Sequence, residues 1–369
     1  MPSIAIFDRT VAHYLAPVKL WLDDPTVAEI MINAHDDIYI EKQGKIIKTP
    51  ARFIDVEAYE AAINNVLQFT GKSLYDDAIL IDARLPDGSR VHVAKRPCAR
   101  FGMATTIRKF AKTMLDMDWL VHIGSISNAA CEYLRIAVQA EQNMLVAGGT
   151  SSGKTSLLNC LSGYIPSDQR IVVIEDSAEL QLQKPHVISL EARAPDRFNN
   201  GAVTIRDLFK SSLRLRPDRI IIGEVRGGEA LEMIQAMTSG HGGSMGTLHA
   251  NSAFDALNRL ETMALMSQVE LPLQALRSQV ASAIDVVVSV QRQVGGRRVL
   301  TQIAEVLPLG DNGYYQLRDI FRLETVMDEK GTKTVQLKAT GERSTFADHL
   351  SPLLAKQVTP LTASIFGIA

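Results

Sequence analysis

The stretch that decides the fold of this chain is Gly148-Gly149-Thr150-Ser151-Ser152-Gly153-Lys154-Thr155. It fits the pattern G-x-x-x-x-G-K-[ST], in which glycines let backbone N–H groups turn inward around phosphate oxygens. The apolar run 143–147 before it is expected to be a buried strand, and the apolar residues at 157, 158 and 161 follow one face of a helix. This order of strand, loop and helix predicts a phosphate-binding loop in an α/β domain.

The loop predicts the binding of a nucleoside triphosphate, because the helix after it also turns its positive dipole end towards phosphate. We expect Lys154 to reach the β- and γ-phosphates of ATP and the Thr155 hydroxyl to ligate Mg²⁺. The predicted nucleotide-binding residues are Gly148, Gly149, Thr150, Ser151, Ser152, Gly153, Lys154, Thr155 and Ser156.

The composition is that of an ordinary globular protein. The 369 residues leave room for two domains, and 46% of them are hydrophobic while 22% are charged. The 39 Lys and Arg nearly balance the 41 Asp and Glu, so no direct binding of nucleic acid is expected. Cys98, Cys131 and Cys160 are scattered, which argues against a zinc site and a disulfide framework and suits a reducing cytosol.

The sequence also bears on location. Asp8 and Arg9 interrupt the first apolar stretch, so a signal peptide is not expected. No apolar run approaches the roughly 18 residues that a membrane-spanning helix needs. We therefore predict a cytoplasmic protein that associates with a membrane through partners or a surface.

The chain is expected to divide near residues 110–120. Short alternating strands dominate residues 1–109 and predict a small α+β domain. Residues 110–120 lie in a polar, methionine-rich and weakly periodic stretch, which suits a linker. In residues 121–369, alternating strands and helices predict a parallel α/β domain. Hairpins with glycine turns are predicted at 295–296, 311–313 and 330–331.

Two further apolar runs end in acidic residues, the first in Glu175 and Asp176 and the second in Gly223 and Glu224. Acids at the carboxyl ends of parallel strands lie where open α/β sheets bind ligands. Because Gly223 replaces the usual metal-side aspartate, we expect Glu224 to polarise the attacking water and Glu175 to support Mg²⁺ or that water. For the first acid pair taken alone, exposed charges after a strand are an equally good interpretation.

Two histidines, His241 and His249, flank a glycine-rich segment after the second run. Zinc ligation is the alternative for them, but no cysteine lies nearby and the spacing suits no helix-based site. We interpret them as contacts to the γ-phosphate, because an imidazole N–H can donate to a phosphate oxygen.

Three arginines lie in the first domain, at Arg84, Arg90 and Arg108. Phosphoryl transfer gains from an arginine aimed at the developing charge, often supplied by another domain or subunit. For any one of them a solvated hairpin charge is the more common explanation, but the set of three predicts at least one such arginine finger.

These elements, in this order, resemble the Walker A, Asp box, Walker B and His box of the secretion ATPase superfamily of type II and type IV systems. Within it the chain is most similar to the CpaF/TadA subfamily, which powers assembly of tight-adherence (Flp) pili. The segments that carry this likeness are 179–187, 215–220, 240–245, 281–285 and 339–346.

The resemblance implies a hexameric ring with a PAS-like N-terminal domain and a RecA-like motor domain, with ATP bound between them. It implies that ATP hydrolysis moves these domains as rigid units, and that the ring docks on inner-membrane platform proteins. Lys154, Thr155 and Glu224 carry over as phosphate, Mg²⁺ and water-activating residues, and Glu175 and His249 support the γ-phosphate. His241 is a further candidate for such a contact, and the small domain's arginine contacts carry over as Arg90 and Arg108, with Arg84 as a third candidate.

Several alternatives stay open at this point. Conjugative ATPases of the TrbB type share all four boxes and are the second choice. A RecA-type DNA motor would draw on a basic cluster, although 6% aromatic content offers little surface for base stacking. That cluster comprises Arg206, Lys210, Arg214 and Arg216. A small-molecule phosphotransferase and a nucleotide-gated scaffold without hydrolysis are further possibilities.

Overall fold

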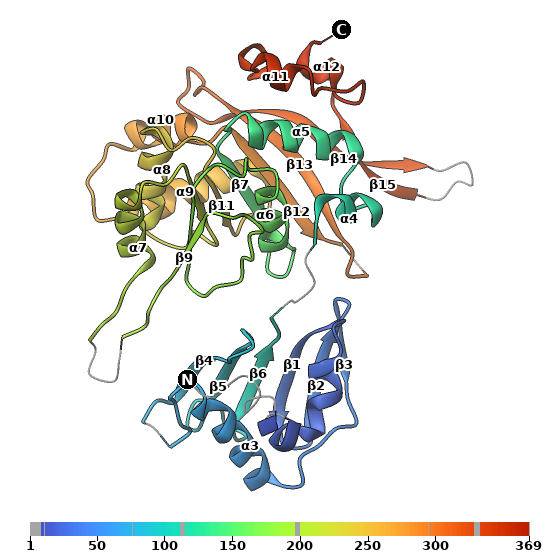
Figure 1. Cartoon of the computed structure of the whole chain (residues 1–369), viewed down its shortest axis with the longest axis vertical. Coiled ribbons are helices and arrows are strands. Elements are labelled where there is room, and N and C mark those ends of the chain that lie inside the picture. Colours follow the sequence, from blue (N-terminus) through green and yellow to red (C-terminus); the bar gives the residue numbers. More distant parts are fainter. Residues whose placement is uncertain are drawn as a thin grey trace. The chain divides into compact units, whose positions relative to one another are not determined.

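The chain divides between Met114 and Leu115 into two units, each with its own sheet (Figure 1). The first unit has one hydrophobic core cluster and the second has two. The computed structural model describes residues 9–10, 12–75, 77–110, 115–195, 200–293, 295–327 and 333–368.

The first unit is an antiparallel sheet covered by one long helix. Its strand order is β3-β2-β1-β6-β5-β4. The strands are β1 (Val27–Ala34), β2 (Asp37–Lys42), β3 (Lys45–Lys48), β4 (Leu80–Arg84), β5 (Arg90–Ala94) and β6 (Ala104–Arg108). Helix α3 (Val56–Gln68) begins where Asp55 accepts a hydrogen bond from the Ala58 N–H. Tyr59 of α3 donates its hydroxyl proton to Thr105 Oγ1 over 2.7 Å, which ties the helix to β6. The short helices η1 (Ala16–Val18) and α2 (Lys19–Asp23) precede β1.

The second unit is built on a nine-stranded sheet with the order β15-β14-β13-β12-β7-β11-β10-β8-β9. The strands from β12 to β9 in this order pair in parallel, and β13, β14 and β15 extend the sheet antiparallel. The strands are β7 (Met144–Gly148), β8 (Ile171–Glu175), β9 (Val187–Glu191), β10 (Arg219–Ile222), β11 (Met245–Leu248), β12 (Val286–Arg292), β13 (Arg298–Leu307), β14 (Gln316–Met327) and β15 (Lys333–Ala339).

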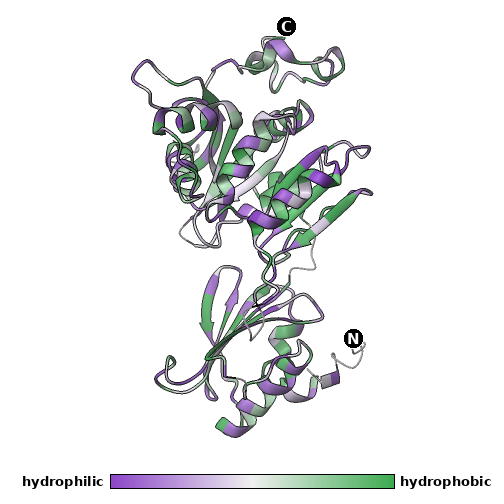
Figure 2. Ribbon diagram, turned by 90° about the vertical axis from the view of Figure 1, so that its left-hand side faces the viewer, coloured by the Kyte–Doolittle hydropathy of each residue, from purple (hydrophilic) through white to green (hydrophobic). Residues whose placement is uncertain are grey.

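Helices cover both faces of this sheet. Alternate residues of the central strands enter opposite cores: Val146 of β7 packs with α5 and α6, whereas Leu145 packs with α7 to α10. Because both faces are covered, every residue of β7, β8, β10 and β11 is buried, and these residues are mainly apolar, with Arg219, Glu175 and Thr247 as exceptions. The hydropathy colouring of the ribbon is shown in Figure 2. The helices are α4 (Met117–His122), α5 (Asn128–Gln139), α6 (Lys154–Ser162), α7 (Ile205–Ser212), η2 (Leu213–Leu215), α8 (Glu229–Thr238), α9 (Ala253–Leu265), α10 (Leu273–Ala283), η3 (Ala347–His349), α11 (Pro352–Ala355) and α12 (Ala363–Phe366). In the described part of the chain, no helix combines the length and apolarity needed to cross a membrane.

The predicted linker at 110–120 is replaced in its second half by helix α4. Asp116 accepts a hydrogen bond from the Trp119 N–H and so begins the helix, and Met117 and Leu120 are buried in the core of the second unit. The methionine-rich composition therefore reflects a packed helix there, while residues 111–114 lie outside the described residues. The predicted turns at 295–296 and 311–313 join β12 to β13 and β13 to β14, and the turn at 330–331 lies outside the described residues.

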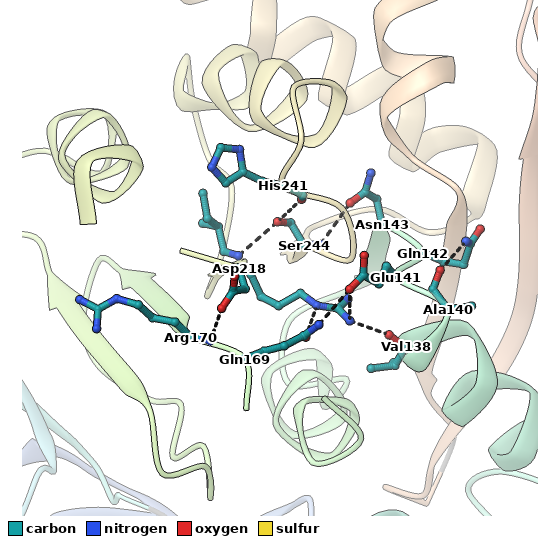
Figure 3. A network of polar contacts seen from close by, with 12 residues as sticks. Val138, Ala140, Glu141, Gln142, Asn143, Gln169, Arg170, Asp218, His241 and Ser244 are labelled. Carbon is teal, nitrogen blue, oxygen red and sulfur yellow. Dashed lines mark hydrogen bonds and ion pairs between the residues drawn. The ribbon is translucent and has the colours of Figure 1, made fainter. Parts of the chain in front are cut away.

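A buried arginine organises the edge of the sheet at which the parallel strands begin. Arg219, the first residue of β10, is fully buried, and burial lowers the pKa of its guanidinium. Its Nε donates to Gln169 Oε1 over 2.8 Å and its Nη2 to the Val138 carbonyl over 3.1 Å. Figure 3 shows the polar network of this edge. Arg219 thus joins the start of β10 to the end of α5.

Gly243 leaves the space that the arginine occupies. A Cβ on Gly243 would lie 1.3 Å from Arg219 Nη1, and the residue has a φ of +70°. Gly240, in the same loop, also has a positive φ (+99°), but its Cβ would meet no atom within 4 Å. Backbone strain is therefore common to both positions, and the collision with a buried cation is specific to Gly243.

We expect Gly243→Ala to destabilise the second unit by about 3 kcal/mol more than Gly240→Ala, because displacing Arg219 breaks buried charge-assisted hydrogen bonds. Urea unfolding of both variants, followed by circular dichroism, measures the difference. Equal losses of stability would show that Arg219 adjusts without cost and that backbone strain alone matters.

Candidate functional site

The predicted phosphate loop leaves the sheet at the carboxyl end of β7. Gly148 must lack a side chain, because a Cβ there would lie 2.5 Å from both the Val290 carbonyl oxygen and Ser152 Oγ. Ser151 (φ +57°) and Gly153 (φ +98°) adopt left-handed conformations, and α6 begins directly afterwards at Lys154. This conformation turns successive N–H groups to one side, as phosphate binding requires.

Two polar side chains of the loop are buried. Lys154 is only 7% exposed, and its Nζ donates to the Gly149 carbonyl over 3.1 Å, which keeps the ammonium group at the loop. Ser152 Oγ is buried and has no hydrogen-bond partner among the described residues. A buried hydroxyl of this kind is expected to find a partner in water or a ligand. Both observations fit an anionic ligand held by the loop.

Glu175 ends β8 at the same edge of the sheet as the loop, and Gly223 makes room for its side chain. Glu175 is 3% exposed, and its Oε1 accepts N–H bonds from Glu179 (2.8 Å) and Leu180 (3.0 Å). A Cβ on Gly223 would lie 2.8 Å from Glu175 Cγ. The Glu175 side chain thus fills the space in which an aspartate at 223 would stand, which gives a physical reason for the glycine.

Glu224 lies between the His249 imidazole and the Arg226 guanidinium at the same edge. Its Oε1 lies 2.7 Å from His249 Nε2, and its Oε2 accepts from Arg226 Nε over 2.6 Å. The Nη1 atom of Arg226 also lies 3.5 Å from Asp176 Oδ2. Sequence reasoning missed Arg226; its position two residues after Glu224 was the available signal, but only the bend of the loop brings its guanidinium back to the carboxylate.

His249 is electrostatically linked to the phosphate loop. Burial lowers the pKa of its imidazole, the positive charge of Lys154 lowers it further, and together these effects outweigh the opposing pull of Glu224. The imidazole is therefore neutral at pH 7, and the 2.7 Å contact is best explained by an Nε2–H that donates to Glu224. In this way Lys154, Glu224 and His249, which are far apart in the sequence, form one site.

His241 does not join this site. It precedes β11, its carbonyl accepts from Ser244 Oγ over 2.8 Å, and the Ser244 N–H donates to Asn143 Oδ1 at the start of β7 (Figure 3). The phosphate loop follows the other end of β7, so a whole strand, roughly 15 Å long, separates the two. The prediction that His241 contacts the γ-phosphate within its own subunit is therefore corrected: residues that flank a strand lie at opposite edges of the sheet.

The three predicted arginines come together in the first unit. Arg84 at the end of β4 pairs with Arg90 at the start of β5, and Arg90 pairs with Arg108 at the end of β6. The structure thus gathers them at one end of three adjacent strands. Their contact with a nucleotide stays a prediction.

The oxygen donors at the loop suit Mg²⁺ that arrives with a nucleotide. Thr155 is the second residue of α6, and Glu175 ends β8 at the same edge of the sheet, with β11 and β10 between β8 and β7. Among the described residues no group of three or more His, Cys, Asp or Glu could hold a metal by itself. Mg²⁺ usually binds through one or two protein oxygens together with substrate phosphates, so this sparse set fits it.

A family model described as "Type II/IV secretion system protein" matches residues 12–344. The chain belongs to the type II/IV secretion system protein family. The match runs through both units and includes every site residue described above.

Relatives in this family carry names from conjugation and type IV secretion. Conjugal transfer protein TrbB of Rhizobium radiobacter is 34% identical over 308 residues, which cover 82% of this chain and 90% of the relative. Type IV secretion system protein VirB11 of Brucella suis is 31% identical over 312 residues, which cover 77% and 86%. The solved structure of the Legionella pneumophila ATPase DotB has the same fold, with a TM-score of 0.54 at 19% identity over 80% of this chain and 79% of that one. The predictions of an α/β ATPase in this superfamily are confirmed, and the narrower CpaF/TadA assignment stays a prediction.

We expect Gly223→Ala to lower kcat/KM for ATP by about tenfold to a hundredfold, because the added methyl group displaces the Glu175 carboxylate and small misplacements at a phosphoryl-transfer site are costly. Gly246→Ala in β11 is the matched control, since its Cβ would meet the flexible Met233 Sδ at 3.2 Å. Steady-state ATPase assays compare the two. Similar losses in both variants would contradict a specific role for the space beside Glu175.

The lowered pKa of His249 predicts the pH dependence of hydrolysis. If hydrolysis requires the neutral imidazole of His249, activity is lost when that ring gains a second proton. Because the pKa of His249 is lowered, this happens only below the ordinary histidine pKa of about 6.5. We therefore expect kcat to stay level from pH 8 down to about 6.5 and to fall at lower pH. A fall centred above that value in the wild type, abolished in His249→Asn, would show that the imidazole is charged in the resting site.

Proposed function

We propose that this protein is an Mg²⁺-dependent ATPase motor that works as a homo-oligomeric ring, expected to be a hexamer. Its hydrolysis of ATP powers the assembly of a tight-adherence (Flp) pilus or a related secretion machine. The observation that carries the catalytic part is the placement of Glu224 against neutral His249, with Lys154 close enough to lower the pKa of that histidine.

The proposed chemistry assigns each residue one task. Loop N–H groups and Lys154 bind the β- and γ-phosphates, and Glu224 accepts the proton of a water whose oxygen attacks the γ-phosphorus while the bond to the β-γ bridging oxygen breaks. Bound Mg²⁺, held with Thr155 and Glu175, would neutralise phosphate charge. The neutral His249 N–H orients one oxygen of Glu224 and leaves the other to Arg226.

We assign to arginines of the first unit the stabilisation of the negative charge that develops on the phosphates in the transition state. Arg90 and Arg108, with Arg84 beside them, form one cluster of cations at the ends of adjacent strands. We infer that closing this cluster on the phosphates couples hydrolysis to domain motion, which the ring transmits to inner-membrane platform proteins from the cytoplasmic side.

A role in conjugative transfer is the second candidate, and the TrbB relative at 34% identity favours it. A DNA motor has less support, because part of its basic cluster has partners within the unit. Arg206 donates to Glu232 over 2.6 Å and to the Ser267 carbonyl over 3.0 Å, and Lys210 lies 4.0 Å from the same glutamate.

The decisive experiment combines ATP hydrolysis with size-exclusion light scattering on the purified full chain. We expect a nucleotide-stabilised oligomer with slow turnover, and at least about a hundredfold loss of kcat in Lys154→Ala, Glu224→Gln and Arg108→Ala. Glu224→Gln should still bind ATP, because it removes only the proton acceptor.

A monomer whose turnover survives Arg108→Ala would overturn the ring motor with arginine contacts. Turnover that requires an added acceptor would favour a phosphotransferase, and strong stimulation by DNA would favour a DNA motor.

A further inference from the structure

The hairpin between β12 and β13 lies at the same edge of the sheet as the phosphate loop. Strand β12 runs parallel to β7, with Val290 opposite Gly148, so the residues after Val290 extend beyond the point where the loop begins. The chain returns as β13, in which Arg298 pairs with Arg292. The start of β13 is therefore a neighbour of the loop, although about 150 residues separate them in sequence.

Arg298 contacts the phosphate loop directly. Its Nε donates to the Ser151 carbonyl over 3.0 Å, and its Cδ lies 3.1 Å from the position that a Cβ on Gly153 would take. Ser151 and Gly153 are the two loop residues with left-handed backbones. The side chain thus crosses the part of the loop whose conformation turns the N–H groups towards phosphate.

Ser125 holds the backbone of β13 at Arg298 in place through two hydrogen bonds. Ser125 Oγ donates to the Arg298 carbonyl over 2.6 Å, and the Leu300 N–H donates to the Ser125 carbonyl over 3.0 Å. The adjacent Arg297 turns elsewhere, since its Nη2 donates to the Gly124 carbonyl over 2.7 Å. Two neighbouring arginines therefore have different tasks, and only one of them contacts the loop.

We propose that Arg298 is a further nucleotide-binding residue of this ATPase. It holds Ser151 in the left-handed conformation, which a non-glycine residue adopts only when its surroundings stabilise it. It also places a permanently charged guanidinium beside bound polyphosphate. The inference rests on the ATP site proposed above. Because the contact is to the loop rather than to the reacting water, Arg298 acts on the affinity for di- and triphosphates and not on the chemical step.

The test compares Arg298→Gln with Arg297→Gln in the full chain. These changes remove the same charge from adjacent residues, and only the first removes the contact with Ser151. Binding of methylanthraniloyl-ADP with Mg²⁺ gives Kd, and steady-state hydrolysis gives KM and kcat separately. Thermal unfolding of each variant confirms that the protein is folded.

For Arg298→Gln we expect Kd and KM to rise about tenfold, the usual scale for a lost charge-assisted hydrogen bond, with kcat changed less than about threefold. Arg297→Gln should stay within about twofold of the wild type. Arg298→Lys keeps the charge but loses the Nε donor, so its Kd should lie between those of the wild type and Arg298→Gln.

Equal effects of Arg298→Gln and Arg297→Gln would overturn the proposal in favour of a general charge effect. A collapse of kcat at unchanged Kd would overturn it in favour of a catalytic role. Failure of the proposed function is a separate result: in that case Lys154→Ala would bind and hydrolyse nucleotide like the wild type, whatever residue stands at 298.

Discussion

The parallel pairing of β7 with β11 on one side and β12 on the other is the constraint on which the nucleotide site depends. Parallel strands end at a common edge, so this pairing brings the loop after Gly148, the histidine after β11 and the end of β12 to one place. Strand β10 joins the same edge through β11 and adds Glu224. Each element contributes one or two groups, and the register of the sheet decides which groups can meet.

Within that edge, the polar groups hold one another in position. Glu175 is buried because it accepts two backbone N–H bonds and because Gly223 leaves it space. Glu224 is oriented by His249 and Arg226, whose nitrogens take one oxygen each. These contacts give the carboxylate oxygens hydrogen-bonding partners in a region that water reaches poorly, and so fix the positions of both side chains. Arg219 has a comparable structural task at the opposite edge, where it ties β10 to α5.

Much of the site could be predicted from sequence because its signals are local. Buried apolar runs are followed at once by the loop, Glu175, Glu224 and His249. A strand and the turn after it consist of consecutive residues, so a local pattern is enough to predict them. The same reasoning is wrong for His241. It lies close to His249 in the sequence, but strand β11 separates the two and places them at opposite edges of the sheet. Local reasoning also fails at α4, where a methionine-rich composition predicts a linker although Asp116 begins a helix.

The sequence by itself determined the phosphate loop, the two acid-terminated strands, the α/β class and the secretion ATPase superfamily, because periodicity and short motifs depend on neighbouring residues. Only the tertiary structure decided that Arg226 returns to Glu224, that Glu175 fills the space at Gly223, and that Arg298 crosses the phosphate loop. Contacts between distant residues follow from strand order and register. Those are set by the packing of both faces of the sheet at once, which no local pattern records.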